Sequence, residues 1–397
     1  MTTNPWETAK KILCVRLDAI GDVLMATPAI RALKTAHRHL TLLTSPSAAA
    51  ITSLIPEIDD RIVYDAPWMK ATAPRANSRP DFELVELLRS RQFDAAVIFT
   101  VYSQNPLPSA FLCYLADIPL RLAHCRENPY QLLTHWILDP EPAKGIRHEV
   151  RRQLDLVASI GCTPPDRRMS IRVAEGDRDR VHRLLSKLGV DLQQPWAILH
   201  PGATALSRRY PPAGFAEVGR RLVLDRNFQV LFTGTEPERE LIADIQTAMG
   251  VPSHSLVGTL NLAEMAALIA TAPLLISNNT GPVHLAAAVG TPVVDLYALT
   301  NPQHTPWGVP HRLLFHDVPC KFCYKSICPE GHHDCLRLVT PEAIVRAASD
   351  LLSEVRGEHY APETQPPLSF WTEEIFVNAR SQEHSAQEIW QVAKPGV

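Results

Sequence analysis

The sequence predicts an α/β protein built on two parallel β-sheets that face a central cleft. Short apolar runs alternate with segments of helical period, which is typical of βαβ units. The alternation stops over 162–177, where paired prolines and charges interrupt it, and then starts again. The length of 397 residues allows two domains of about 100–200 residues each.

The first domain is expected to cover 1–175. Apolar runs predict its strands, and residues that recur three and four apart predict its helices. The strands are expected at 11–17, 40–45, 61–65 and 94–100, and the helices at 22–36, 81–92 and 106–119.

A helix over 176–189 opens the second domain, which is expected to cover 176–355. The tail, 356–397, is rich in Pro, Gln and Glu, and we expect it to be disordered or packed back on the first domain. The further strands are expected at 195–202, 229–235, 274–278 and 292–297, and the helices at 214–225, 236–250, 262–272 and 281–290.

Charge and hydropathy exclude several classes of protein. With 39 Lys and Arg against 42 Asp and Glu, the net charge is −3, which gives no basic face for nucleic acid. The first residues lack the apolar core of a signal peptide. The longest apolar stretch, 262–277, contains Glu264 and Pro273 and is shorter than the ~20 residues of a membrane span. We therefore expect a cytoplasmic protein, whose cysteines are not disulfide-bonded.

Ligand sites in such sheets lie where strands run into helices. The first such turn contains Gly21 and Asp22. Asp22 is either an ordinary cap of the helix that follows or a general base that the helix dipole keeps ionised.

Two later turns carry charged residues. Arg208 and Arg209 precede Tyr210-Pro211, and they are either solvated or offer forked donors to phosphate oxygens. Glu236 follows the strand at 229–235 and is either a cap or an acceptor for ribose hydroxyls.

The most informative turn is 277–284, Ser-Asn-Asn-Thr-Gly-Pro-Val-His. A strand ends there and a helix of small residues begins at once. The N–H groups of Thr280 and Gly281 at a helix start form a site suited to a pyrophosphate. His284, one turn later, either reaches the same oxygens or is buried structurally.

These segments, in this order, resemble glycosyltransferase family 9, the ADP-heptose:lipopolysaccharide heptosyltransferases. The matching motifs are RLDAIGDVLMATPAIRALK, HPGA with RYPPAGFAEV, GTLNLAEMAALIATA with SNNTGPVHLAAAVGTPVV, and CPEGHHDC. The resemblance covers roughly residues 11–350.

The resemblance implies a GT-B fold of two Rossmann-like domains. The first domain, 1–175, would bind the acceptor, and the second, 176–355, would bind the nucleotide-sugar. The reaction would invert the anomeric centre without a catalytic metal or other cofactor, and Asp22 would be the base. The donor-binding residues would be Arg208 (a lysine in the family) with Arg209, Glu236 on the ribose, Val257 and Gly258 at the adenine, Asn279 (acidic in many relatives) at the sugar, and Thr280, Gly281 and His284 at the diphosphate.

The expected reaction is transfer of heptose from ADP-heptose to the inner core of a lipopolysaccharide. Two alternatives stay open: the same fold acting with another NDP-sugar or on a protein acceptor, and a non-catalytic protein that binds nucleotide-sugars. A dehydrogenase is disfavoured because no G-x-G-x-x-G follows the first strand.

An acidic glycolipid acceptor would need cations in the first domain. The candidates are Lys70, Arg75, Arg121 and Arg126, each of which is equally well explained as a surface residue. The charged run 144–152 either lies against anionic lipid at the inner membrane or is a solvated helix face.

Four cysteines cluster near the second domain's end: Cys320, Cys323, Cys328 and Cys335. The C-x2-C pair is typical of metal ligands, but the later spacings do not match a standard zinc motif. One protein-glycosylating branch of the family holds iron on four cysteines. The sequence therefore leaves a structural Zn or Fe open.

Overall fold

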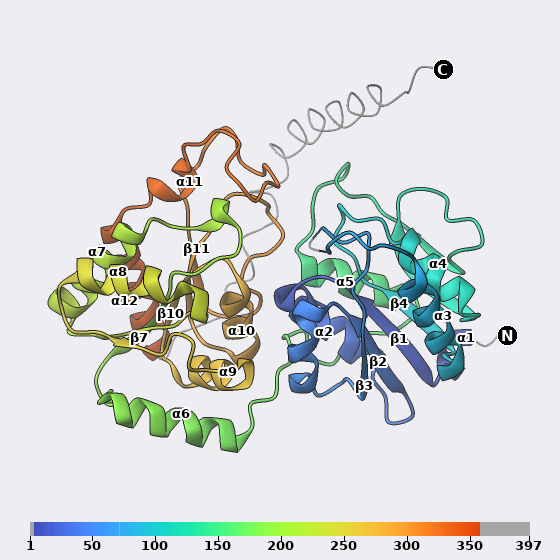
Figure 1. Ribbon diagram of the computed structural model, residues 1–397, viewed down its shortest axis with the longest axis horizontal. Coiled ribbons are helices and arrows are strands. Elements are labelled where there is room, and N and C mark those ends of the chain that lie inside the picture. The colour runs from blue at the N-terminus through green and yellow to red at the C-terminus, as the bar shows by residue number, and fades with distance from the viewer. Residues whose placement is uncertain (1–3, 71, 358–397) are drawn as a thin grey trace.

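The computed structural model describes residues 4–70 and 72–357. Within them the chain forms two six-stranded sheets, each wholly parallel, with helices on both faces (Figure 1). The first sheet has the order β3-β2-β1-β4-β5-β6 and the second β12-β11-β10-β7-β8-β9. The strands of the first are β1 (Lys11–Arg16), β2 (His39–Thr44), β3 (Asp60–Val63), β4 (Ala95–Ile98), β5 (Leu120–Cys125) and β6 (His135–Leu138). Those of the second are β7 (Trp196–His200), β8 (Gln229–Phe232), β9 (His254–Ser255), β10 (Leu275–Asn278), β11 (Val293–Leu296) and β12 (His311–Leu314).

Both sheets have the same topology. In each, the first strand in the chain lies in the middle, and the order reverses between it and the fourth, that is, between β1 and β4 and between β7 and β10. Crevices form at the carboxyl ends of strands where the order reverses. The fold therefore places one crevice in each half of the molecule.

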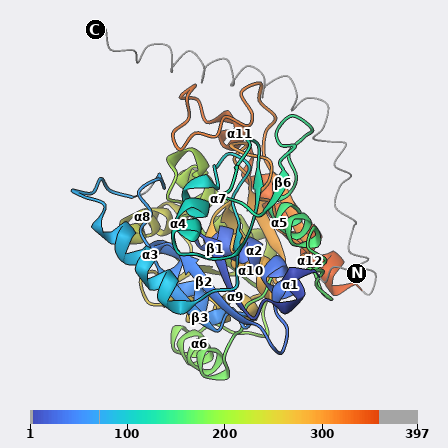
Figure 2. The same ribbon diagram turned by 90° about the vertical axis from the view of Figure 1, so that its right-hand side faces the viewer.

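The central strands are apolar because both of their faces are covered. β1 is buried from Ile12 onward, and it pairs in parallel with β2 and β4. Helices cover the two faces, which is the reason such strands show continuous apolar runs rather than alternation. Figure 2 shows the first sheet with α2 and α3 around it.

The first half contains five α-helices among the described residues. They are α1 (Pro5–Thr8), α2 (Ile20–Leu33), α3 (Arg79–Arg91), α4 (Leu107–Leu115) and α5 (Glu149–Ala158), with the 3-10 helix η1 (Pro46–Leu54). The helices that follow are α6 (Glu175–Leu188), α7 (Pro212–Arg226), α8 (Arg239–Met249), α9 (Leu262–Thr271), α10 (Gly281–Val289), α11 (Asp334–Arg337) and α12 (Pro341–Arg356), with η2 (Leu206–Arg208) and η3 (Glu236–Glu238).

The α/β class and all eight predicted strands are confirmed, but four strands were not predicted. β6 and β12 are only partly buried, and β9 has two residues, so none of the three has a long apolar run. β5 is buried but contains Arg121 and His124, which interrupt the apolar run by which a buried strand is predicted. The helix predicted over 236–250 begins as η3 and becomes α8.

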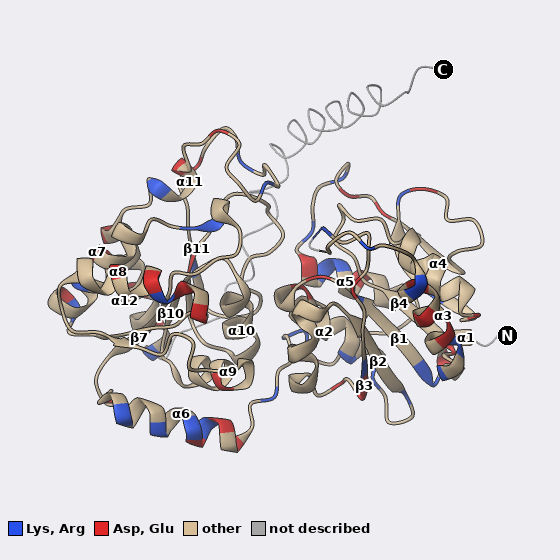
Figure 3. Ribbon diagram, in the orientation of Figure 1, with Lys and Arg blue, Asp and Glu red and all other residues tan. Residues whose placement is uncertain are grey.

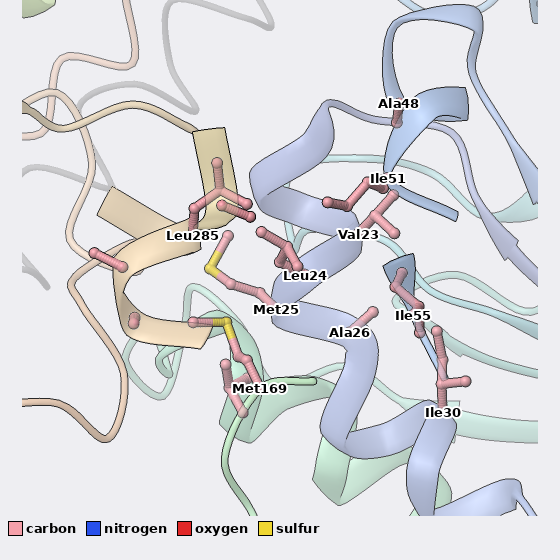
Figure 4. Packing of buried hydrophobic residues seen from close by; sticks show 14 of the residues in the cluster. Val23, Leu24, Met25, Ala26, Ile30, Ala48, Ile51, Ile55, Met169 and Leu285 are labelled. Atoms are coloured by element: carbon pink, nitrogen blue, oxygen red, sulfur yellow. The ribbon is translucent and has the colours of Figure 1, made fainter. Parts of the chain in front are cut away.

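The two halves share one hydrophobic core. Helices α2 and α10 face each other between the sheets (Figure 1), and their buried residues belong to a single cluster. Figure 4 shows Leu285 of α10 beside Leu24 and Met25 of α2, with Met169 below them. The other face of α2 packs Val23 and Ile30 toward η1.

The charged run 144–152 is not a lipid-facing surface. Glu149 and Arg152 of α5 are buried, and the Arg152 guanidinium is paired with the carboxylates of Asp139 and Glu141. The expectation of lipid contact through this run is therefore wrong for its buried residues. A helix whose charges are exposed is α6, which carries residues of both signs along its length (Figure 3).

The sequence predicted that no segment spans a membrane, and it set the C-terminal tail apart from the two domains. Among the described residues, no helix has the length and apolarity that crossing a membrane requires. The tail predicted from 356 lies outside the described residues, apart from Arg356 and Gly357. The predicted border between domains falls at the start of α6.

Candidate functional site

Two cavities open at the two crevices. The larger, about 540 Å³, lies at the carboxyl ends of β7, β8 and β10 and is closed on one side by Ile20 of α2. The smaller, about 240 Å³, lies at the carboxyl ends of β1 and β4. Asp18 lines the smaller cavity and Ile20 lines the larger. The start of α2 therefore separates the two.

The larger cavity has an apolar end and a polar end. The apolar lining comes from Leu256, Leu262, Met265 and Leu285. Thr280 and Gly281, at the start of α10, also line it. An apolar slot beside a helix N-terminus suits a ligand with an aromatic base and a phosphate.

Two glutamates lie at the polar end. The Glu236 carboxylate is exposed and forms a two-pronged ion pair with Arg239, with both N–O distances 2.6 Å. This pairing lowers the pKa of Glu236. Gly258 has φ +66°, and a Cβ there would lie 1.9 Å from Glu236 Oε2. The positive φ is what favours glycine at this position, because the exposed Glu236 side chain could move away from a Cβ.

Glu238 occupies the inner wall. Its Oε2 accepts hydrogen bonds from the N–H and the hydroxyl of Thr235, at 2.7 and 2.9 Å. A Cβ on Gly202 would lie 2.0 Å from Glu238 Oε1. The His200 imidazole lies nearby, and burial lowers the pKa of His200 to about 4.

Asp22 lies between the two cavities, as the third residue of α2. Its Oδ1 lies 3.2 Å from Arg16 Nη2, and its Oδ2 accepts a 3.3 Å hydrogen bond from the Ala19 N–H. The side chain is 20% exposed. Asp22 is therefore not the N-cap residue, although one of its oxygens satisfies the N–H of that residue.

Arg16, at the end of β1, is fully buried and serves three carboxylates. Besides Asp22, it pairs with Asp18 at 2.9 Å and with Glu149 at 2.8 Å. Burial raises the pKa of Asp18 and of Glu149, against the attraction of Arg16. One guanidinium thus holds three acids in place: Asp18 in the turn after β1, Asp22 in the first turn of α2, and the first residue of α5, Glu149.

Gly21 lies at a point of close contact between the two halves. A Cβ there would lie 2.5 Å from Cδ2 of His284 in α10. The sequence indicated Gly21 for a tight turn, but its φ is ordinary and it lies inside α2. The close approach of two helices is what requires a glycine here.

His284 is buried under this contact. Its Nδ1 has no hydrogen-bond partner among the described residues. Burial, followed by repulsion from Arg208, lowers the pKa of His284 to about 4. The structure thus places His284 in the helix interface, whereas Thr280 and Gly281 face the cavity.

His304, from the loop between β11 and β12, lies close to Asp22. Its Nε2 lies 3.9 Å from Asp22 Oδ1 and has no hydrogen-bond partner within the described part of the chain. Burial and the nearby Arg208 hold the pKa of His304 well below its usual value. Its backbone oxygen accepts a 3.0 Å hydrogen bond from Asn279.

The side-chain amide of Asn279 donates its hydrogen bonds to other groups of the protein. Its Nδ2 also donates to Asp295 Oδ2, at 2.8 Å. Asp295 is fully buried, its Oδ1 has no partner among the described residues, and burial raises the pKa of Asp295 to about 8. Both amide hydrogens of Asn279 are thus used, and only its oxygen remains for a sugar.

The two arginines predicted for the phosphates differ. Arg208 lies near the buried groups His284, Asp295 and His304 and influences the pKa of each. Arg209 is exposed, and its Nε donates to the Ala203 carbonyl at 2.7 Å. Arg208 is therefore the one that faces the interface between the halves.

None of the four cations predicted for the acceptor lines either cavity. Arg121 donates to the backbone carbonyls of Ile118, Gln131 and Leu132. The other three contact different groups: Arg75 with Asp81, Arg126 with the Tyr102 carbonyl, and Lys70 with Ser326 of the second half.

The four cysteines of the segment lie near one another, and burial, followed by each of the other three, raises the pKa of Cys335. Cys320, Cys323, Cys328 and Cys335 are all unbonded and partly buried, and Cys320 Sγ lies 3.7 Å from His332 Nε2. Among the described residues, no three His, Cys, Asp or Glu side chains are grouped so that they could hold an ion.

Six residues of the site were missed in the sequence. Arg16 and Asp295 are single charges in apolar strands, and such charges are rarely buried without a partner. Thr235 and Glu238 have the T-x-x-E spacing of a capping box, which the structure contains. Asp18 had no signal beyond its place after a strand, and His304 had none.

Comparison with known proteins gives one family. The model of Glycosyltransferase family 9 (heptosyltransferase) matches residues 82–333, more than half of the chain. The Lipopolysaccharide heptosyltransferase 2 of Escherichia coli (strain K12) is 25% identical over 364 residues, which cover 86% of this chain and 98% of that protein.

Solved structures share the whole fold. The glycosyl transferase family 9 from Veillonella parvula DSM 2008 superposes with a TM-score of 0.73 and is 22% identical, covering 89% of this chain and 99% of that one. The E. coli ADP-heptose lps heptosyltransferase II superposes with a TM-score of 0.67 at 22% identity, covering 87% and 100%. These similarities confirm the predicted fold of two facing Rossmann-like units.

Proposed function

Because the chain belongs to glycosyltransferase family 9, we propose that it transfers heptose from ADP-heptose to a hydroxyl in the inner core of a lipopolysaccharide. The names of its relatives support this donor and this class of acceptor. The donor would bind to the half formed by 176–355 and the acceptor to the half formed by 1–175. Since the acceptor is a glycolipid, we place the enzyme at the cytoplasmic face of the inner membrane.

One observation carries the proposal. Residues 18–22 lie between two cavities, one at the switch point of each sheet. A transferase that joins two substrates needs both to reach one base. This segment contains two carboxylates, Asp18 and Asp22, and we assign the role of base to Asp22, as the family resemblance implies. A protein that only stored a nucleotide-sugar would have no use for the second cavity.

The donor fits the larger cavity. The base would lie against Leu256, Met265 and Leu285, with Val257 and Gly258 forming the turn beside it. Glu236 would accept hydrogen bonds from the ribose. The N–H groups of Thr280 and Gly281 would donate to the diphosphate, helped by the positive end of α10.

The reaction is a single displacement. Asp22 takes the proton of the acceptor hydroxyl while that oxygen attacks C1 of the heptose. The C1–O bond to the diphosphate breaks from the opposite face, so the configuration at C1 inverts and ADP leaves with the bonding electron pair. Charge grows on the leaving phosphate, where Arg208 and the start of α10 stabilise it more strongly than in the ground state.

Arg16 orients the base. Its guanidinium contacts Oδ1 of Asp22 and also holds Asp18 and Glu149, so the Asp22 carboxylate cannot turn away without losing a charge-assisted contact. The second oxygen, Oδ2, is bound only at 3.3 Å by the Ala19 N–H. That oxygen is the better placed to take a proton.

A nucleotide panel tests the donor. We expect ADP to raise the melting temperature of the protein selectively over UDP, GDP and CMP, because ligands that bind the folded state stabilise it. Differential scanning fluorimetry measures the shift at matched ligand concentrations. A selective response to UDP or GDP would overturn the assignment of an adenine-linked donor.

The substitution Asp22→Asn tests the base. It keeps the shape of the side chain and removes its basicity, so transfer should fall by at least ~100-fold while ADP still raises the melting temperature. The assay follows the mass of the glycosylated core, and Asp225→Asn, at an exposed position of α7, is the control. Near-normal transfer by Asp22→Asn would remove Asp22 from the mechanism.

A further inference from the structure

The smaller cavity has its own chemistry. Val15, Leu17 and Asp18 line it from the end of β1, and Phe99 and Thr100 from the end of β4. Its volume, about 240 Å³, lies below the roughly 300–1,000 Å³ of pockets for drug-sized ligands. One sugar ring is a suitable occupant, whereas an oligosaccharide is not.

The part of the chain that the structure describes contributes a carboxylate and no cation to the lining. Asp18 lines the cavity, and neither Lys nor Arg of the described residues does. The nearest guanidinium described above, Arg16, already faces the three carboxylates of Asp18, Asp22 and Glu149. An anionic ligand would therefore lie beside Asp18 with no unshared positive charge to balance it, which is costly away from water.

The remaining lining combines aromatic and uncharged polar groups. Trp68 and Phe99 offer flat apolar surfaces, and Ser103, Gln104 and Asn105 offer hydroxyl and amide groups. Gln104 Nε2 donates to Asp18 Oδ1 and so fixes the acid in the wall. Aromatic faces with a few oriented polar groups suit a ligand that has an apolar face and hydroxyl edges.

One polar atom in this wall lacks a partner. Thr100 is buried, and its Oγ1 has no hydrogen-bond partner among the described residues. Buried hydroxyls are normally satisfied, so such an exception requires an explanation. A ligand hydroxyl in the cavity that Thr100 lines would supply the missing partner.

We infer that this cavity binds the acceptor ring and selects an uncharged pyranose, one without carboxylate or phosphate. The inference rests on the proposed function, since it assigns the substrate class on the acceptor side of the same site. Asp18, which lines the cavity, pairs with the same guanidinium as Asp22, which does not line it. A ring in the cavity would therefore lie next to the ion-pair cluster that contains the base. The acidic groups of a core oligosaccharide then lie outside the cavity. This differs from the sequence-based expectation of a cationic acceptor site.

The test compares two glycosides that share an alkyl aglycone, a mannoside and the corresponding mannuronide, which differ by one carboxylate. Isothermal titration calorimetry in the presence of ADP measures the binding of each to the full chain. We expect the mannoside to bind at least ~10-fold more tightly, because the carboxylate meets Asp18 without an unshared cation. Equal or tighter binding of the mannuronide, or binding of neither glycoside, would overturn the inference.

A variant locates the ring. Thr100→Val keeps the shape and removes the unpartnered hydroxyl, and we expect it to weaken mannoside binding by about 5-fold, as for one lost hydrogen bond. Thr247→Val, at an exposed position of α8, is the matched control and should bind as the wild type does. Unchanged mannoside affinity in Thr100→Val would place the ring elsewhere.

The experiments distinguish a failure of the proposed transfer reaction from a failure of the proposed acceptor subsite. ADP binding and Asp22-dependent transfer to a lipopolysaccharide core test the reaction, and neither depends on which glycoside binds. If both hold while the mannuronide binds better, the family reaction stands and only the neutral acceptor subsite is lost.

Discussion

Arg16 shows how one buried charge can organise a site. A fully buried guanidinium is stable only with partners that balance its charge, and Arg16 has three, from the β1–α2 turn and from α5. The residue touches neither proposed substrate in this arrangement. Its influence on the reaction passes through the orientation of Asp22, which makes it a positioning residue.

Asp295 gives a prediction about pH. Burial raises its pKa to about 8, whereas an unfolded aspartate titrates near 4. Between these values the folded protein holds a proton that the unfolded chain releases, so rising pH favours unfolding across about pH 4 to 8. We expect Asp295→Asn to flatten this part of the stability profile.

Chemical denaturation at several pH values measures the effect, with Asp225→Asn as a control that should keep the wild-type slope. An unchanged slope in Asp295→Asn would show that Asp295 is not protonated in the folded state.

Single residues were predictable from the sequence only in part. Asp22, Glu236, Thr280 and Gly281 follow strands, so their places at the strand ends could be predicted from local pattern. Arg16 lies in an apolar strand, where the pattern gives no hint of its three partners. His304 reaches Asp22 from a distant loop of the other half, and no local pattern carries that information.

At the scale of elements, the contact of α2 with α10 sets the geometry. Gly21 and His284 meet where the two helices cross, and the apolar residues around them pack into one core. The distance between the proposed base and the proposed diphosphate site therefore depends on side-chain volume at this crossing. A single methyl group there has consequences in both halves.

Gly21→Ala tests this. The new Cβ would lie 2.5 Å from His284 Cδ2, so the buried His284 ring or one of the two helices must shift, and overpacking of this kind costs about 1–3 kcal/mol. We expect a lower denaturation midpoint and slower transfer. Gly176→Ala in α6, where a Cβ meets nothing within 4 Å, is the matched control and should leave the midpoint unchanged or raise it. If Gly21→Ala behaves as Gly176→Ala does, the close approach has no influence on stability.

Elements were predicted well where burial is continuous and poorly at the sheet edges. β1, β4, β7 and β10 lie in the middle of their sheets, and their apolar runs identify them. β6 and β12 lie at edges with one side open, so their sequences mix polar and apolar residues. β5 was missed for another reason, because Arg121 and His124 interrupt its buried run. The charge run near α5 was misread because buried ion pairs and a solvated face have the same composition.

At the scale of the molecule, the two sheets have the same strand order, although the sequence shows no repeat between them. Equal topology gives two switch points, and the contact of α2 with α10 turns them toward each other. The sequence could predict two such units, since alternation of strands and helices is a local property. How they meet depends on contacts between distant segments, which periodicity does not report.

The shared core between the halves has a consequence for the energetics of binding. His148 contacts the Thr305 carbonyl at 2.9 Å, Trp307 donates to the Arg167 carbonyl at 2.8 Å, and Met25 and Leu285 are buried together. Separating the two halves would expose this apolar surface to water, at a free-energy cost of about 25 cal/mol per Å². Folding therefore already fixes the two halves relative to each other. The entropy cost of bringing them together is incurred at that stage and not when a ligand binds.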